Sequence, residues 1–95
     1  MMYVVSYDIS GDKLRTKVAA ELENFGKRVQ YSVFECRLDR KRFTVLYQRL
    51  CTLMTGCEDG NIKIYRLCQQ CENKIRIIGD CDKPEKTKDE EVIVI

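Results

Sequence analysis

Asp8 is a carboxylate at the end of the most apolar strand-like stretch of the chain, YVVSYDIS, residues 3 to 10. A hard cation such as Mg²⁺ prefers oxygen ligands and keeps several of its waters. Such an ion at Asp8 would polarise a phosphate and lower the pKa of a bound water. An ordinary turn residue is the alternative, because Asp is common in turns. Spacing alone does not decide between the two interpretations.

Histidine is absent from the sequence. This excludes Ser/His/Asp and Cys/His arrangements for nucleophilic catalysis. Any hydrolysis must therefore proceed without an imidazole base, and we expect a metal-bound hydroxide as the nucleophile.

Basic residues are interleaved with aromatic residues between positions 13 and 34. They are Lys13, Arg15, Lys17, Lys27, Arg28, Tyr31 and Phe34. Arg15, Lys17 and Arg28 are candidates for nucleic-acid binding through phosphates, by contacts that are sensitive to salt and indifferent to base sequence. The alternative is a solvated helix face, the usual environment of Lys and Arg, and it stays open for Lys17 and Lys27.

Three further residues are candidates for supporting such a site: Tyr7, Ser32 and Phe34. Tyr7 and Phe34 are equally typical of a hydrophobic core, and Ser32 of an ordinary strand position. The pattern does not separate these roles.

Charge divides the chain into two parts. Residues 1–79 carry a net charge of +5 and read as one domain, whereas residues 80–95 carry a net −3 and read as an acidic tail with a terminal strand. A mildly basic body permits nucleic-acid binding without proving it.

No apolar run approaches the roughly 20 residues of a membrane helix, and the start of the chain does not read as a signal peptide, so we expect a cytoplasmic protein without membrane contact.

Six cysteines include one C-x2-C pair, Cys68 and Cys71. In a reducing compartment they are free thiols or metal ligands rather than disulfides. The pattern does not favour zinc, because a structural zinc site usually has two close cysteine pairs and here there is one, with Cys57 or Cys81 as the nearest addition. A thioredoxin-like role is weaker still, because no βαβ pattern frames the pair.

Hydrophobic periodicity predicts the elements that must position these residues. The expected strands are 2–9, 27–30, 32–38, 61–67, 75–78 and 92–95. The expected helices begin at the N-caps Asp12 and Asp39 and end at Gly26 and Gly56. Residues 68–73 form a turn or a single helical turn.

The element order β-α-β-β-α-β predicts a ferredoxin-like α+β fold, with both helices on one face of an antiparallel sheet. Within the chain nothing remains to cover the other face. A second protomer is the natural cover, and the extra strands 75–78 and 92–95 are the segments expected to cross over.

The stretches YVVSYDIS, KLRTKVAAELENFGKRVQYSVFECRL and DGNIKIYRLCQQC together resemble the small CRISPR-associated protein two family over residues 1 to about 79. The resemblance implies a strand-exchanged ferredoxin-like homodimer. It implies that Asp8 is the metal-binding and catalytic residue of a Mg²⁺-dependent endonuclease acting on single-stranded RNA or double-stranded DNA.

The resemblance also implies a non-catalytic alternative. In it, the dimer takes part in spacer acquisition as a scaffold that bridges the CRISPR-associated integrase and binds duplex DNA. One departure concerns the paired arginines early in the first helix of many members. Here the pair reads Leu14-Arg15, so one basic contact is missing.

Overall fold

Residues 1–79 are described by the computed structural model, and residues 80–95 lie outside this part. The elements are β1 (Met2–Ile9), α1 (Asp12–Glu23), β2 (Lys27–Gln30), β3 (Val33–Arg37), α2 (Arg40–Met54), β4 (Gly60–Leu67) and α3 (Gln69–Glu72). They confirm the predicted order and the single helical turn after β4. The predicted domain limits at 79 and 80 stay a prediction.

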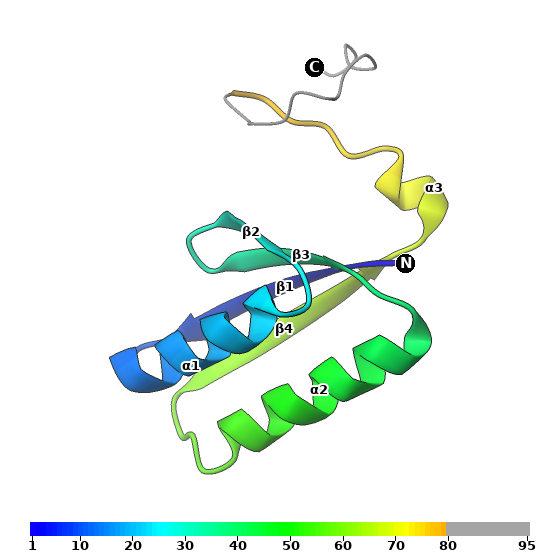
Figure 1. Ribbon diagram of the computed structural model, residues 1–95. Coiled ribbons are helices and arrows are strands. Elements are labelled where there is room, and N and C mark those ends of the chain that lie inside the picture. Colours follow the sequence, from blue (N-terminus) through cyan, green and yellow to red (C-terminus); the bar gives the residue numbers. More distant parts are fainter. Residues whose placement is uncertain (80–95) are drawn as a thin grey trace.

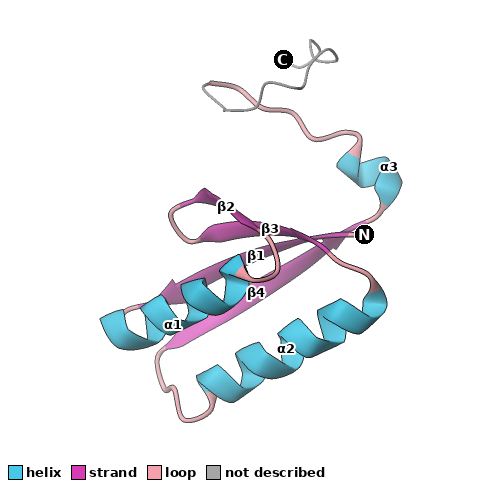
Figure 2. Ribbon diagram, viewed as in Figure 1, coloured by secondary structure: helices cyan, strands magenta, loops and turns pink. Residues whose placement is uncertain are grey.

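The four strands form one antiparallel sheet in the order β2-β3-β1-β4, so β1 is central as predicted (Figure 1). Helices α1 and α2 lie together on one face of this sheet (Figure 2). This is the ferredoxin-like arrangement that the element order predicts. Among the described residues, no helix is long and apolar enough to cross a membrane.

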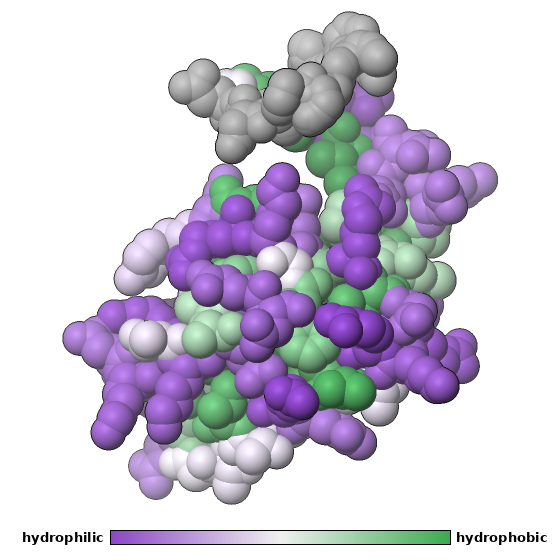
Figure 3. Space-filling view, viewed as in Figure 1, coloured by the Kyte–Doolittle hydropathy of each residue, from purple (hydrophilic) through white to green (hydrophobic). Residues whose placement is uncertain are grey.

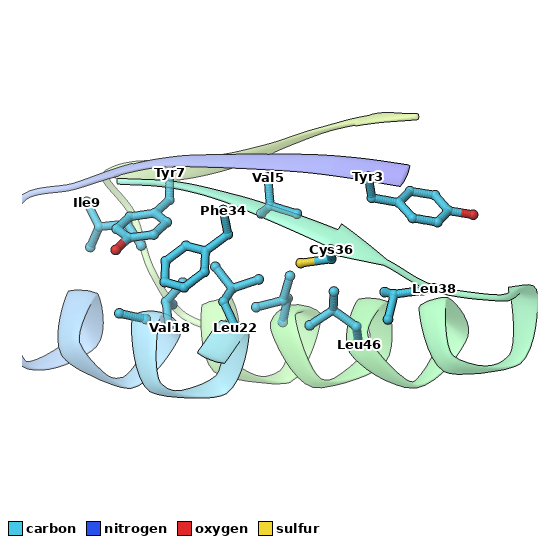
Figure 4. Close-up of a cluster of buried hydrophobic side chains, with 12 residues drawn as sticks. Tyr3, Val5, Tyr7, Ile9, Val18, Leu22, Phe34, Cys36, Leu38 and Leu46 are labelled. Carbon is cyan, nitrogen blue, oxygen red and sulfur yellow. The ribbon is translucent and has the colours of Figure 1, made fainter. Parts of the chain in front are cut away.

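The core lies between the sheet and the two helices (Figure 4). Alternation along β1 sends every second side chain to this face. The residues buried there include Tyr3, Val5, Tyr7 and Ile9 from β1, Phe34 and Cys36 from β3, and Val18, Leu22, Leu46 and Leu50 from the helices. Because the core uses the odd-numbered positions of β1, Asp8 is directed to the opposite face.

The two helix starts differ from each other. Asp39 caps α2 as predicted, because its Oδ1 accepts from the backbone N–H of Arg42 at 2.8 Å. The prediction for Asp12 was wrong: Gly11 is the N-cap of α1, and Asp12 is the first helical residue and pairs with the Arg15 side chain. The ion pair one turn along the helix takes the carboxylate away from the capping position.

Gly26 has a different role from the predicted helix cap. Helix α1 ends at Glu23, with Asn24 as its C-cap, and the φ of Gly26 is not positive. Instead, a Cβ on Gly26 would lie 2.3 Å from the carbonyl oxygen of Glu35 and 2.6 Å from the sulfur of Cys36. The glycine is required by close packing against β3. Helix α2 ends at Met54, close to the predicted end at Gly56, and Gly56 has a left-handed backbone with φ 84°.

The sheet face opposite α1 and α2 is partly open. Tyr65 of β4 is 54% exposed, and its β1 partner Val4 is half-buried. At one end of the sheet α3 lies on the side away from the two long helices (Figure 1), where Glu72 forms an ion pair with Arg37 of β3. As predicted, α1 and α2 leave most of this face uncovered.

The predicted strand at 75–78 is not formed within the chain. Its isoleucines are exposed, with Ile77 at 51% and Ile78 at 86%. A strand needs a neighbour for its backbone hydrogen bonds, and the described part of the chain offers this segment none. The predicted strand at 92–95 lies outside the described residues.

Candidate functional site

Asp8 lies at the end of the central strand, as the sequence predicted. It is exposed on the sheet face opposite the helices, and it is paired in register with Asn61 of β4. Neither neighbour on β1, Tyr7 or Ile9, shares this face, because both are buried against the helices. The carboxylate is therefore accessible, and it is held on a rigid element.

The donor set at Asp8 fits a magnesium ion only in part. Mg²⁺ is commonly held by one or two carboxylates with several waters retained, and an exposed carboxylate is a donor of that type. Within residues 1–79, however, no three His, Cys, Asp or Glu side chains come together as a metal site. Among the described residues, Asp8 is therefore a single acidic donor, at the lower end of what a magnesium site uses. In the same range, Cys68 and Cys71 have no third such ligand beside them, and Cys81 lies outside the described residues.

Arg15 is anchored to the end of β1 that carries Asp8. Its Nη1 donates to the backbone carbonyls of Ile9 at 3.0 Å and Ser10 at 3.2 Å, and its Nη2 pairs with Asp12. The hydrogen bond with Asp12 raises the pKa of Arg15 above its ordinary value, and the nearby phenol of Tyr31 adds to the effect. The guanidinium is thus a fixed cation that still has donors to spare.

Arg28 is held in a similar way from the other side. Its Nη1 donates to the carbonyl of Tyr31, and its Nη2 lies 3.7 Å from Glu23 of α1. The guanidinium carbon stands 5.1 Å from the ring centroid of Phe34, a cation–π arrangement. Phe34 is fully buried, so its contribution to the site is the ring face against which the Arg28 guanidinium packs.

Both arginines line one cleft of about 300 Å³ between α1 and the turn that joins β2 to β3. These two segments lie on the same side of the molecule (Figure 1). The lining residues are Tyr7, Arg15, Thr16, Ala19, Ala20, Glu23, Arg28 and Tyr31. The structure therefore brings together three of the predicted residues: Tyr7, Arg15 and Arg28.

Other predicted residues lie outside this cleft. Lys17 is exposed on α1 but is not part of the lining. Ser32 contributes its backbone, because its carbonyl accepts from the N–H of Tyr7 at 3.1 Å. This bond places the Tyr31–Ser32 turn beside the end of β1. The cleft lies on the helix side of the sheet and Asp8 on the other side, with this end of β1 between them.

Sequence reasoning missed the remaining lining residues. Ala19 and Ala20 leave space beside α1, and Glu23 reaches Arg28 from the helix. An Ala-Ala pair is an ordinary helix sequence, and only its position opposite the β2–β3 turn makes it part of a cleft. Tyr31 is among the aromatic residues interleaved with the basic ones, but it was not predicted as a site residue.

The five cysteines in the described range are free. Cys68 and Cys71 are close enough to interact: hydrogen bonds from the backbone and thiol of Cys71 lower the pKa of Cys68, and the bond to Cys68 raises the pKa of Cys71. Cys36 is buried, and loss of solvation raises the pKa of its thiol to about 11.

Comparison with known proteins gives a consistent result over most of the chain. The family model described as CRISPR associated protein Cas2 matches residues 1–75. A protein named CRISPR-associated endoribonuclease Cas2 1, from Chloroflexus aurantiacus, is 46% identical over 89 residues, which cover 94% of this chain and 96% of that protein.

Solved structures agree in fold. The crystal structure of Streptococcus pyogenes Cas2 at pH 6.5 superposes with a TM-score of 0.69 at 30% identity, covering 83% of this chain and all of that one (100%). A chain of a partial Cas6-RT-Cas1–Cas2 complex superposes with a TM-score of 0.71 at 30% identity, covering 81% of this chain and 83% of that one. With the family model and the relative's identity over nearly its whole length, these likenesses show that the chain belongs to the CRISPR-associated protein Cas2 family.

Proposed function

We propose that this protein is a metal-dependent endonuclease that hydrolyses phosphodiester bonds of single-stranded RNA or double-stranded DNA, and that it takes part in spacer acquisition in the cytoplasm. The observation that carries the proposal is the exposed carboxylate of Asp8 at the end of the central strand, next to the residues that anchor Arg15. The name of the Chloroflexus relative, an endoribonuclease, supports the activity, and the Cas1–Cas2 assembly supports the role.

Each residue has a distinct part in this proposal. Asp8 holds the cation, and Arg15 and Arg28 bind phosphates of the strand on either side of the cleft. A bound Mg²⁺ supplies the Lewis acid that activates water and stabilises charge on the phosphate. Lys17 extends the basic surface along α1. Tyr7, Ser32 and Phe34 hold the arginines and the turn in place and do not touch the reacting atoms.

The site requires a homodimer. One Asp8 is a sparse ligand set, and the open sheet face offers apolar surface at Val4 and Tyr65 for a second copy. In a two-fold assembly the two Asp8 carboxylates face each other. Like charges at close range repel, so the pair favours a cation between them.

A non-catalytic scaffold is the second candidate. It is favoured by the lack of a multi-carboxylate cluster within residues 1–79 and by the likeness to a chain from a Cas1–Cas2 complex. In this alternative the dimer bridges the CRISPR-associated integrase and binds duplex DNA through the same basic surface. Asp8 then has no chemical role.

Cleavage assays separate the two candidates. Single-stranded RNA and duplex DNA are incubated with the protein in Mg²⁺ or in EDTA, and Asp8→Asn is compared with Asp59→Asn, an exposed residue before β4. The nuclease proposal expects Mg²⁺-dependent products from the wild type and from Asp59→Asn, and loss of cleavage in Asp8→Asn. Equal cleavage by Asp8→Asn would remove Asp8 from the mechanism, and no cleavage by any form would favour the scaffold.

A further inference from the structure

Tyr31 is the most exposed of the aromatic residues around the cleft. It is 72% exposed in the β2–β3 turn, and its phenol lies beside the guanidinium of Arg15. In the view of Figure 3 most of the surface consists of hydrophilic residues. An exposed aromatic ring on such a surface buries little area within its own fold, but it offers a flat face for stacking.

The two arginines flank this ring from different elements. Arg15 approaches from α1, and Arg28 approaches from β2. Both are fixed by backbone carbonyls: Ile9 and Ser10 hold Arg15, and Tyr31 holds Arg28. A guanidinium that is fixed in this way loses less freedom when it binds a phosphate, and its remaining donors suit the planar bidentate contact.

The space between these groups has the size of a small-molecule site. A volume of about 300 Å³ is at the lower end of the range of roughly 300–1,000 Å³ typical for small ligands. The small side chains of Ala19 and Ala20 leave space on the α1 side of the cleft, and Glu23 lines the cleft near Arg28. The Glu23 carboxylate beside Arg28 disfavours a purely anionic occupant, but it can accept hydrogen bonds from the amino group of a base.

We infer that this cleft binds one unpaired nucleotide of a single-stranded nucleic acid, with its base stacked on Tyr31 and its phosphates held by Arg15 and Arg28. A duplex presents phosphates but keeps its bases stacked and paired, so only an unpaired strand fills the cleft. The inference deepens the proposed function and rests on it for the class of ligand. It favours single-stranded RNA over double-stranded DNA as the substrate at this site.

The test measures binding in EDTA, where cleavage does not contribute. The probe is a fluorescein-labelled hexauridylate, followed by anisotropy at fixed salt, with a blunt DNA duplex as the second probe. Tyr31→Ala should weaken hexauridylate binding about tenfold, because one base–aromatic stack is worth ~1–3 kcal/mol and ~1.4 kcal/mol is a factor of ten. Tyr31→Phe should retain the affinity, because it keeps the ring.

Tyr47→Ala is the matched control. Tyr47 is 51% exposed on α2 and does not line the cleft, so its removal should leave both affinities unchanged. Duplex binding should change less than twofold in Tyr31→Ala. The inference would be overturned if Tyr31→Ala lost equal affinity for hexauridylate and for duplex, or if its affinity for hexauridylate stayed within twofold of wild type.

A photocrosslink gives a second measurement that needs no variant. Hexauridylate with one 5-iodouridine should crosslink to the peptide that contains Tyr31, and a crosslink elsewhere alone would contradict the inference. Ribose 5-phosphate should not compete at the concentrations at which uridine 5′-monophosphate does; equal competition would reduce the cleft to a phosphate site. These binding measurements do not depend on cleavage. A protein that binds as expected, but hydrolyses nothing in the cleavage assay, would refute the nuclease proposal and leave this inference intact.

Discussion

Arg15 donates from Nη1 to the backbone carbonyl of Ile9 at 3.0 Å, and this bond joins the first turn of α1 to the end of the central strand. Asp8 precedes Ile9, so the same short segment holds an acidic side chain on one face of the sheet and a cation on the other. An arginine with this anchor has a structural and an electrostatic role at once. Replacing it by Lys keeps the charge but not the fork of donors.

The electrostatic role predicts a salt effect. Arg15→Gln and Arg28→Gln should each weaken hexauridylate binding and lower the slope of log K against log salt by about one, the expected change for one phosphate contact. The control is Arg49→Gln, because Arg49 of α2 pairs with Glu21 of α1 at 3.2 Å and does not line the cleft. Three variants with the wild-type slope would show that the cleft arginines do not contact phosphate.

Close packing between α1 and β3 predicts a steric effect at Gly26. Gly26→Ala should destabilise the fold by about 1–3 kcal/mol, the usual cost of overpacking, because the added Cβ meets the backbone of Glu35 and Cys36. Gly11→Ala is the control, since it has open space and an extended φ of −75°. Urea unfolding measures both variants. If Gly26→Ala costs no more than Gly11→Ala, the close approach is not a constraint on folding.

The order of the elements was predictable because each element carries its own hydrophobic period. The role of Gly26 was not, because it depends on which strand passes α1. In the same way, Arg15 and Arg28 could be proposed as basic residues, but 12 residues lie between them in the sequence, and only the fold places both beside one cleft. The strand predicted at 75–78 is not formed within the single chain, and its pairing with a second protomer stays a prediction.

Burial of Cys36 predicts a loss of stability at high pH. The pKa of this thiol is raised from an ordinary 9.0 to about 11, so the folded state holds the proton more tightly than the unfolded state. The resulting stabilisation is complete below about pH 9 and is lost as the pH rises towards 11. Urea unfolding between pH 8 and 11 should show a steeper fall for the wild type than for Cys36→Ala.

The quantity to compare is the change in the free energy of unfolding with pH, not its absolute value. The cavity left by Cys36→Ala and the titration of other groups then do not affect the comparison. As a check on accessibility, Cys36 should resist alkylation in the native protein while the exposed Cys51 reacts. Parallel pH profiles for wild type and Cys36→Ala would show that the thiol does not contribute to the alkaline loss.

Apolar side chains that the single chain leaves exposed predict assembly into a dimer. Ile75, Ile77 and Ile78 are exposed after α3. The chain that follows α3 lies away from α1 and α2 in Figure 1. Apolar burial is worth roughly 25 cal/mol per Å², and a standard interface buries ~800 Å² per partner. We expect a two-fold dimer in which residues 75–78 pair with the sheet edge of the partner.

Sedimentation of the full chain tests this assembly. Ile77→Asp should weaken the dimer, whereas Val45→Asp, at a comparably exposed position (42%) on α2, should not. Truncation before Ile75 should dissociate or unfold the protein, and truncation after Gly79 should weaken the dimer if the terminal VIVI takes part. A full-length chain that sediments as a monomer at micromolar concentration would remove the shared metal site, because a single Asp8 carboxylate does not supply the second acidic ligand.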